Sequence, residues 1–215
     1  TTRRQLEELR RKQEERRKLL AAERHLEPVT TDGRKIIVSA NIGSAEEIAG
    51  ALENGAGSVG LFRSEFLFMR GKALPDEQTQ FEAYKAAAQA FSDGFVVLRT
   101  LDIGGDKPVE SISIPREENP FLGYRAVRIS LAEPALFKAQ LRAGLRASAF
   151  GPLKIMFPMV SGPNEMRRIL EVLDDARAEL NDEGVEYDRT MELGVMVEVP
   201  SAVFMAEELL RDVDF

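Results

Sequence analysis

After residue 34 the chain alternates between short apolar runs and longer amphipathic segments, and this alternation restricts the possible folds more than any other feature. The apolar runs predict five β-strands, at 35–41, 58–62, 95–99, 153–157 and 193–199. The segments between and after them predict helices at 44–54, 75–90, 119–130, 134–147, 164–180 and 200–211, and 213–215 could open a sixth strand. Such alternation favours a parallel sheet covered by helices, and nearly continuous apolar strands suit burial on both faces.

Two architectures fit this pattern, a doubly wound sheet and a (β/α)8 barrel of the TIM type. Polar residues stand at or just beyond the carboxyl ends of four different predicted strands: Asn41, Arg63, Arg99 and Glu198. In a barrel those ends meet at one mouth, where active sites are built from several strands. We therefore predict an α/β fold of the TIM-barrel type. Because such a barrel takes about 250 residues, we expect only its first five β/α units here.

Composition limits the functions that the chain can have. The sequence has 215 residues, a net charge of −7 and no cysteine. The negative charge argues against nucleic acid or an anionic membrane as partner, and the missing thiols exclude disulfides and cysteine chemistry within this chain. No apolar run approaches the ~20 residues that span a bilayer. We expect a cytoplasmic protein.

The first 24 residues differ from the rest, with nine Lys or Arg against five Glu. They contain no Gly or Pro and predict a solvated helix, whose few leucines are too sparse for a coiled coil. Pro28 ends this segment and Thr31-Asp32-Gly33 predicts a turn. We divide the chain into a charged linker, 1–30, and a partial barrel, 31–215. His25, inside the linker, is expected to be exposed and non-catalytic.

The predicted strand 95–99 leads into the densest group of candidate site residues. Arg99 ends the strand, two acids, two glycines and Lys107 follow, and Arg125 comes later at a predicted helix start. Arginine and lysine donate charge-assisted hydrogen bonds to phosphate or carboxylate, and glycines let the main chain approach a ligand. A salt-bridge cluster of Arg99 and Lys107 with Asp102 and Asp106 is the alternative. The paired glycines favour the ligand.

Two further residues carry weaker signals. Arg63 lies between apolar residues, and an ion pair with nearby Glu65 is as good an interpretation as an anion ligand. Glu198 ends a strongly apolar strand, where a carboxylate is costly to bury. It could bind Mg²⁺, because hard cations take carboxylate oxygens. A single Glu is a weak metal signal by itself.

Six segments in order resemble one family: GLFRSEFLFMR, LRTLDIGGDK, ENPFLGYRAVRIS, QLRAGLRASAFG, IMFPMV and GVMVEVPSA. They are similar to the phosphoenolpyruvate-binding barrel of the enzyme I family of the bacterial sugar phosphotransferase system. The resemblance runs from about residue 36 to residue 215, and the charged helix before it is similar to that family's interdomain linker. Pyruvate phosphate dikinase and phosphoenolpyruvate synthase resemble it more distantly and are the enzymatic alternative. A non-catalytic binding or dimerisation module is the other.

The resemblance implies a role for each candidate residue. Arg63, Arg99 and Arg125 would hold the phosphate and carboxylate of phosphoenolpyruvate, with Lys107 in the same positive lining. Glu198 would be one of two carboxylate ligands to Mg²⁺. In that family the phosphoryl group passes to a histidine on a separate amino-terminal domain and then to the carrier protein HPr, and the carboxyl-terminal domain forms the homodimer contact.

The chain also departs from that family. It lacks the acceptor histidine, the Asn-Asp pair with the second metal ligand, a further arginine and the catalytic cysteine. We therefore expect no catalytic residue in this chain and no turnover of phosphoenolpyruvate by the chain alone. The residues do not separate a sugar pathway from a nitrogen-related one.

Overall fold

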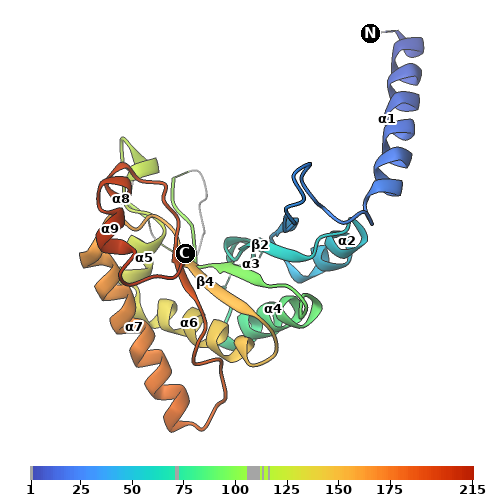
Figure 1. Ribbon diagram of the computed structural model, residues 1–215. Coiled ribbons are helices and arrows are strands. Elements are labelled where there is room, and N and C mark those ends of the chain that lie inside the picture. Colours follow the sequence, from blue (N-terminus) through green and yellow to red (C-terminus); the bar gives the residue numbers. More distant parts are fainter. Residues whose placement is uncertain (1, 71–72, 106–111, 113, 116) are drawn as a thin grey trace.

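The computed structural model describes residues 2–70, 73–105, 112, 114–115 and 117–215 (Figure 1). Five strands are present in it: β1 (Ser39–Ile42), β2 (Ser58–Arg63), β3 (Val96–Arg99), β4 (Leu153–Phe157) and β5 (Leu193–Val195). The α-helices are α1 (Arg3–Glu23), α2 (Ile48–Glu53), α3 (Glu65–Met69), α4 (Glu77–Ala90), α5 (Val127–Ala132), α6 (Pro134–Ser148), α7 (Pro163–Asp182), α8 (Pro200–Phe204) and α9 (Ala206–Leu209). Two 3₁₀ turns, η1 (Ala45–Glu47) and η2 (Pro120–Leu122), complete the elements.

The order of the strands decides between the two predicted architectures. All neighbouring strands are parallel, and the order in the sheet is β1-β2-β3-β4-β5, the order along the chain. A doubly wound sheet reverses its strand order at a switch point, whereas a TIM-type barrel adds each strand beside the previous one. Helices α4, α6 and α7 lie together on one face of the sheet (Figure 1). The prediction of a partial TIM-type barrel is confirmed.

The main core fills the space between the sheet and these helices. Leu98 of β3 and Ile155 of β4 point toward α6, where a Cβ on Gly144 would lie 3.1 Å from Ile155 Cδ1 and 3.2 Å from Leu98 Cδ2. The prediction of strands buried on both faces holds for β3 and is wrong for β4, in which buried and half-buried residues alternate. The half-buried residues of β4, Lys154 and Met156, lie on the face opposite the helices, where Met156 is paired with Arg99.

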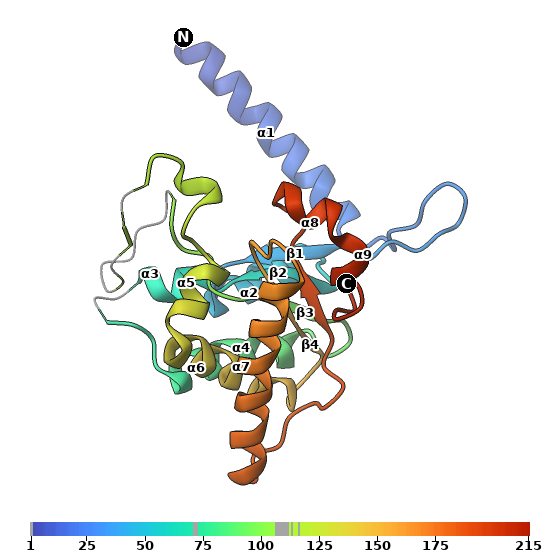
Figure 2. The ribbon, with the colours of Figure 1, turned by 90° about the vertical axis from the view of Figure 1, so that its left-hand side faces the viewer.

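Helix α1 stands away from the body of the molecule, and Figure 2 shows it projecting beyond the sheet. None of its residues is buried, as the sequence predicts. The predicted turn follows, with Gly33 at a φ of 86°. His25 is exposed, and its Nε2 accepts a hydrogen bond of 3.1 Å from Arg24 Nε. Among the described residues no helix has the length and apolar character to cross a membrane. The boundary at residue 30 stays a prediction.

Some predicted bounds are wrong, most clearly in the segment 119–130, which is not one helix. The η2 turn is closed by Gly123 N, which donates to Pro120 O at 3.3 Å, and Arg128 Nη1 donates to the carbonyls of Leu122 and Gly123 at its end, each at 2.5 Å. Helix α5 then begins only at Val127. Strand β1 begins at residue 39 instead of 35, and β5 ends at 195 instead of 199. Residues 213–215 run beside β5, where Val195 N donates to Phe215 O at 3.0 Å.

Candidate functional site

Arg63 and Arg99 are neighbours at the carboxyl ends of β2 and β3. The register pairs the two residues directly. Side chains alternate along a strand, and Phe62 and Leu98 point into the core, so the two arginines share the opposite face. This is the juxtaposition that the sequence predicted for strand ends in a barrel. Arg63 also lies over the ring of Phe66, with its Cζ 4.6 Å from the ring centroid.

Arg99 is held by two buried carboxylates. Its Nη2 lies 2.6 Å from Glu65 Oε1 and 3.1 Å from Asp102 Oδ2, and its Nη1 lies 3.9 Å from Met196 Sδ. The Arg99 side chain is 8% exposed and the Glu65 side chain is fully buried. The sequence had offered Glu65 as the partner of Arg63. The paired register explains the difference, because Glu65 follows β2 at the first residue of α3 and faces the neighbouring strand.

Asp102 joins Arg99 to Arg125. Its Oδ1 accepts a hydrogen bond of 2.7 Å from Arg125 Nη2, while Oδ2 faces Arg99. The flanking residues Leu101 and Ile103 are buried in a small apolar cluster with residues of α3 and α5, so Asp102 points to the opposite side. Arg125 lies in the connection before α5, not within a helix as predicted. The structure therefore joins Arg99 and Arg125 through a shared carboxylate and places Arg63 beside Arg99 on the neighbouring strand.

The paired glycines lie against Arg125. Gly104 has a φ of 106°, and a Cβ there would lie 2.5 Å from Arg125 Cβ. Gly105, with a φ of 67°, would place a Cβ 3.3 Å from Arg125 Nη1. The main chain that approaches these glycines closely is thus the Arg125 segment. The close neighbour that the structure shows for these glycines is Arg125 at the end of β3, and their approach to a ligand stays a prediction.

The three arginines retain unused donors. The Nε atoms of Arg63, Arg99 and Arg125 are buried and have no hydrogen-bond partner among the described residues. A buried donor without a partner is costly, and a bound anion or water would satisfy it. Among the described residues, Glu65 and Asp102 bind Arg99, Asp102 also binds Arg125, and Arg63 adds a further positive charge beside Arg99. The site can therefore accept an anion.

Glu198 follows β5 in the connection to α8. Its Oε1 accepts a hydrogen bond of 2.8 Å from Met159 N, and its side chain is exposed. The argument from costly burial is therefore wrong, because β5 ends three residues earlier. No contact among the described residues joins Glu198 to the three arginines, although Met196 reaches Arg99. Lys107, the remaining candidate, lies outside the described residues.

Glu198 is a single carboxylate, and this limits the kind of metal site that it could form. Within the described part of the chain no group of three or more His, Cys, Asp or Glu residues could enclose a metal ion. Mg²⁺ does not need such a cage, since it usually keeps several waters and takes one or two carboxylates together with substrate oxygens. Glu198, exposed and with one oxygen already used, fits a Mg²⁺ of that kind only.

Backbone strain marks the same end of the sheet. Among the described residues, Ala126 with a φ of 49° and Met159 with a φ of 60° are the non-glycine residues with positive φ. Ala126 follows Arg125, and Met159 donates its N–H to Glu198. Such conformations cost about 1–3 kcal/mol each and gather at functional sites. Their positions agree with a site at the carboxyl ends of the strands.

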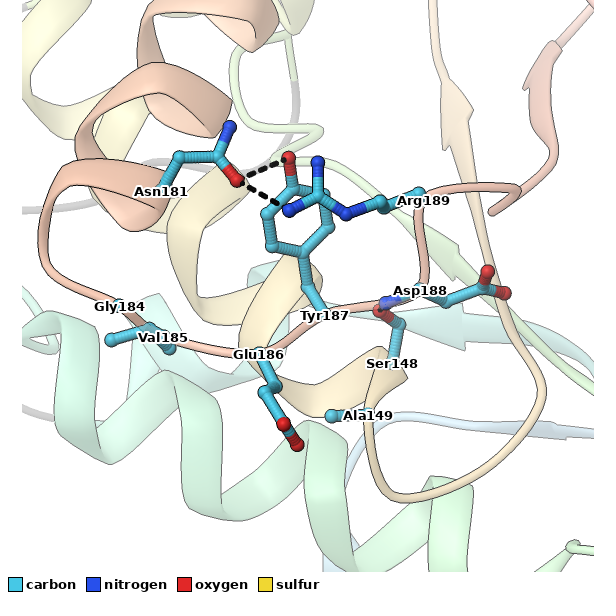
Figure 3. A pocket seen from close by; sticks show the side chains of 9 residues that line it. All are labelled: Ser148, Ala149, Asn181, Gly184, Val185, Glu186, Tyr187, Asp188 and Arg189. Atoms are coloured by element: carbon cyan, nitrogen blue, oxygen red, sulfur yellow. Dashed lines mark hydrogen bonds between the residues drawn. The ribbon is translucent and has the colours of Figure 1, made fainter.

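A hollow of about 620 Å³ lies elsewhere, between the ends of α6 and α7 and the chain that enters β5 (Figure 3). Its polar groups largely bond to one another: Asn181 Oδ1 accepts from Arg189 Nη2 at 2.9 Å and from Tyr187 Oη at 3.4 Å. Ser148 Oγ accepts from Asp188 N at 2.9 Å. It opens at the amino-terminal ends of the strands, the end that stabilises a barrel. We do not place the function there.

Comparison with known proteins gives one consistent result. The family model described as PEP-utilising enzyme, PEP-binding domain, matches residues 17–215. A phosphoenolpyruvate-protein phosphotransferase of Staphylococcus carnosus is 50% identical over 192 residues, 89% of this chain and 34% of the relative. That of Haemophilus influenzae is 48% identical over 196 residues, 91% of this chain and 34% of the relative. That of Buchnera aphidicola is 43% identical over 192 residues, again 89% and 34%. The chain spans about a third of the length of these curated relatives.

Proposed function

This chain belongs to the PEP-utilising enzymes and carries their PEP-binding domain, and we propose that it binds phosphoenolpyruvate with Arg63, Arg99 and Arg125. The observation that carries the proposal is the pairing of Arg63 with Arg99 at two adjacent strand ends, with Arg125 joined to Arg99 through Asp102. Phosphoenolpyruvate has a phosphate and a carboxylate, and guanidinium groups bind both in planar, two-pronged geometry.

The buried carboxylates support this assignment because they fix the arginines before a ligand arrives. Glu65 and Asp102 each hold an Nη atom, and the Nε atoms of Arg99 and Arg125 have no partner in the part of the chain that the structure describes. Arginines ordered in advance lose little side-chain freedom on binding, which improves affinity. They also fix the orientation of the bound anion, and transfer of a phosphoryl group depends mainly on positioning and charge neutralisation. Lys107 belongs to the proposal as an additional donor.

Mg²⁺ is the proposed cofactor, and Glu198 is the residue that would hold it. When bound, the ion would neutralise charge on the phosphate and carboxylate oxygens. The Met159 N–H fixes one carboxylate oxygen of Glu198 and so orients the side chain. The carboxylate therefore points in a defined direction without help from a metal.

The relatives are named phosphoenolpyruvate-protein phosphotransferases, which favours transfer from phosphoenolpyruvate to a protein over the dikinase and synthase alternatives. We propose that this chain supplies the binding part of that activity, that HPr is the later acceptor, and that the complete protein is a cytoplasmic homodimer. The chain has one histidine, the exposed His25, and no cysteine. We therefore propose that it does not turn over phosphoenolpyruvate alone, and phosphorylation of added HPr by this chain would contradict this.

Calorimetric titration of the chain with phosphoenolpyruvate in the presence of Mg²⁺ tests the proposal. We expect binding to the wild type and weaker binding to Arg63→Ala and Arg125→Ala. Arg146→Ala is the matched control, since Arg146 is bonded to Glu77 and Gln78 between α6 and α4, away from the strand ends. If the folded wild type binds no phosphoenolpyruvate, the arginines form only an ion-pair cluster and the proposal fails.

A further inference from the structure

Four buried polar side chains connect the site to the helices behind the sheet: Gln140 of α6, Ser64 after β2, and Tyr84 and Gln80 of α4, here called the Gln140 network. Each is at most 2% exposed. Buried polar groups of this kind need partners, and these groups supply them to one another. The sequence shows Gln140 only as a polar residue in QLRAGLR, and the function proposed above does not use it.

Each hydrogen bond of the network has a defined donor and acceptor. Gln140 Nε2 donates to Ser64 Oγ and to Tyr84 Oη, both at 3.1 Å. Tyr84 Oη donates in turn to Gln80 Oε1 at 3.1 Å, and Gln80 Nε2 donates to Pro75 O at 3.0 Å. Burial raises the pKa of the Tyr84 hydroxyl, so that it stays protonated and able to donate. Gln140 therefore uses both amide protons.

The other end of the network bonds to the main chain that carries Arg99. Ser64 Oγ donates to the Arg99 carbonyl at 2.7 Å, and Gln140 Oε1 accepts from Leu101 N at 2.8 Å. Strand β3 ends at Arg99, and the β2–β3 register also ends there. The backbone groups just past a strand have no partner from that ladder. Here the Ser64 hydroxyl and the Gln140 side-chain amide supply the partners that the strand ladder no longer provides.

We infer that Gln140 and Ser64 are positioning residues, which hold the Arg99–Leu101 main chain so that the Arg99 guanidinium meets the anion in a fixed place. Ser64 lies between Arg63 and Glu65, so the same hydroxyl ties the β2 end, with its cation and its carboxylate, to the β3 end. A displacement of about 1 Å at such a site can cost about 100-fold. The inference rests on the proposed function and deepens it.

Two hydroxyl deletions separate positioning from stability. Ser64→Ala and Tyr84→Phe each remove one buried hydroxyl that accepts from Gln140 Nε2, so each leaves one Gln140 proton without its partner. Both should lower the Tm by about 2–10 °C. Only Ser64→Ala frees the Arg99 carbonyl. We expect it to raise the Kd for phosphoenolpyruvate with Mg²⁺ about tenfold, and Tyr84→Phe to stay within about twofold of wild type.

Ser64→Thr, which keeps the hydroxyl, should restore the Kd to within about threefold of wild type. If Ser64→Ala does not fold, Ser64→Cys replaces it, because a thiol is a weak donor of similar size. Equal changes in Kd for the serine and tyrosine variants, or an unchanged Kd in the folded serine variant, would overturn the inference.

Amide hydrogen exchange of the ligand-free chain keeps this test independent of the proposed function. If the wild type binds no phosphoenolpyruvate, the proposed function fails, and exchange at Leu101 still decides the positioning claim. We expect Ser64→Ala to increase exchange at Leu101 and Tyr84→Phe to leave it near wild type. Equal exchange in the two variants would refute the positioning role.

Discussion

Two clusters of arginine and carboxylate differ in how completely their charges are matched. On the helices, Arg142 Nε, Nη1 and Nη2 bond to Glu77, Glu179 and Glu183 at 2.7, 3.1 and 2.7 Å. At the strand ends, the described carboxylate partners of Arg99 bond to its Nη2 alone, and its Nε has no described partner. Saturated donors hold helices together, whereas spare donors leave a place for an anion. The difference lies in the donors that have no described partner.

The largest expected effect comes from Arg99→Ala, which breaks the strand-end cluster. Phosphoenolpyruvate affinity should fall about 100-fold or more, because a central donor is lost. Stability should also fall, by about 3–5 kcal/mol, because the buried carboxylates of Glu65 and Asp102 lose a cation. Calorimetry and urea unfolding measure the two losses. Unchanged affinity in folded Arg99→Ala would remove Arg99 from the site.

Glu198→Gln tests whether Glu198 at the strand ends binds Mg²⁺. The amide keeps an oxygen that accepts from Met159 N but loses the charge that Mg²⁺ prefers. The Mg²⁺ concentration needed for half-maximal phosphoenolpyruvate binding should rise about 10-fold or more. The control is Glu192→Gln, because Glu192 bonds to Lys154 across β4 and β5. Equal Mg²⁺ dependence in the two variants would exclude Glu198 as the ligand.

Arg142→Met tests the saturated cluster. It should leave phosphoenolpyruvate affinity within about twofold of wild type and cost about 1–3 kcal/mol of stability, measured by urea unfolding. The loss should shrink at high salt, because the carboxylates around Arg142 are partly exposed. A marked loss of affinity in the folded variant would show that the helix cluster and the site are coupled.

The smallest effect concerns pH. Hydrogen bonding to Lys138 lowers the pKa of Glu179 from its ordinary value of 4.5, and the charges of Lys138 and Arg142 add to this. A carboxyl with a lowered folded pKa stabilises above pH 4.5 and loses that contribution as pH falls below it. The Tm of Glu179→Gln should therefore fall less than that of wild type between pH 6 and pH 3. Parallel curves would contradict this role of Glu179.

The sequence predicted the strand-end arginines because their signal is local. Arg63 and Arg99 each end an apolar run, and an apolar run followed by a cation can be recognised directly in the sequence. The same reasoning offered Glu65 as a partner of Arg63, whereas Glu65 pairs with Arg99, and it did not indicate that the glycines of GGD lie against Arg125. Partner choice depends on strand register, and register depends on packing across the sheet. The residues next to Glu65 and Gly104 in the sequence do not indicate what these two residues will contact.

Helix boundaries show the same limit. The sequence predicts one helix at 119–130, although this segment contains Pro120 and Gly123. Arg128 instead donates to two carbonyls at the end of the η2 turn, and Arg125 lies outside the helix, beside Asp102. Glycine costs about 1 kcal/mol in a helix interior, so Gly123 itself disfavours one continuous helix, and the contacts of Arg125 and Arg128 hold the segment before α5 outside it.

By itself the sequence determined the alternation of strand and helix, the exposed first helix and the cations at the strand ends, because each follows from the order of neighbouring residues. Only the tertiary structure decided that Glu65 and Asp102 hold those cations, that two glycines admit Arg125, and that Gln140 reaches the Arg99 main chain. Ser64 and Gln140 are 76 residues apart. Contacts over such separations arise when α6 packs on the sheet, so no local pattern records them.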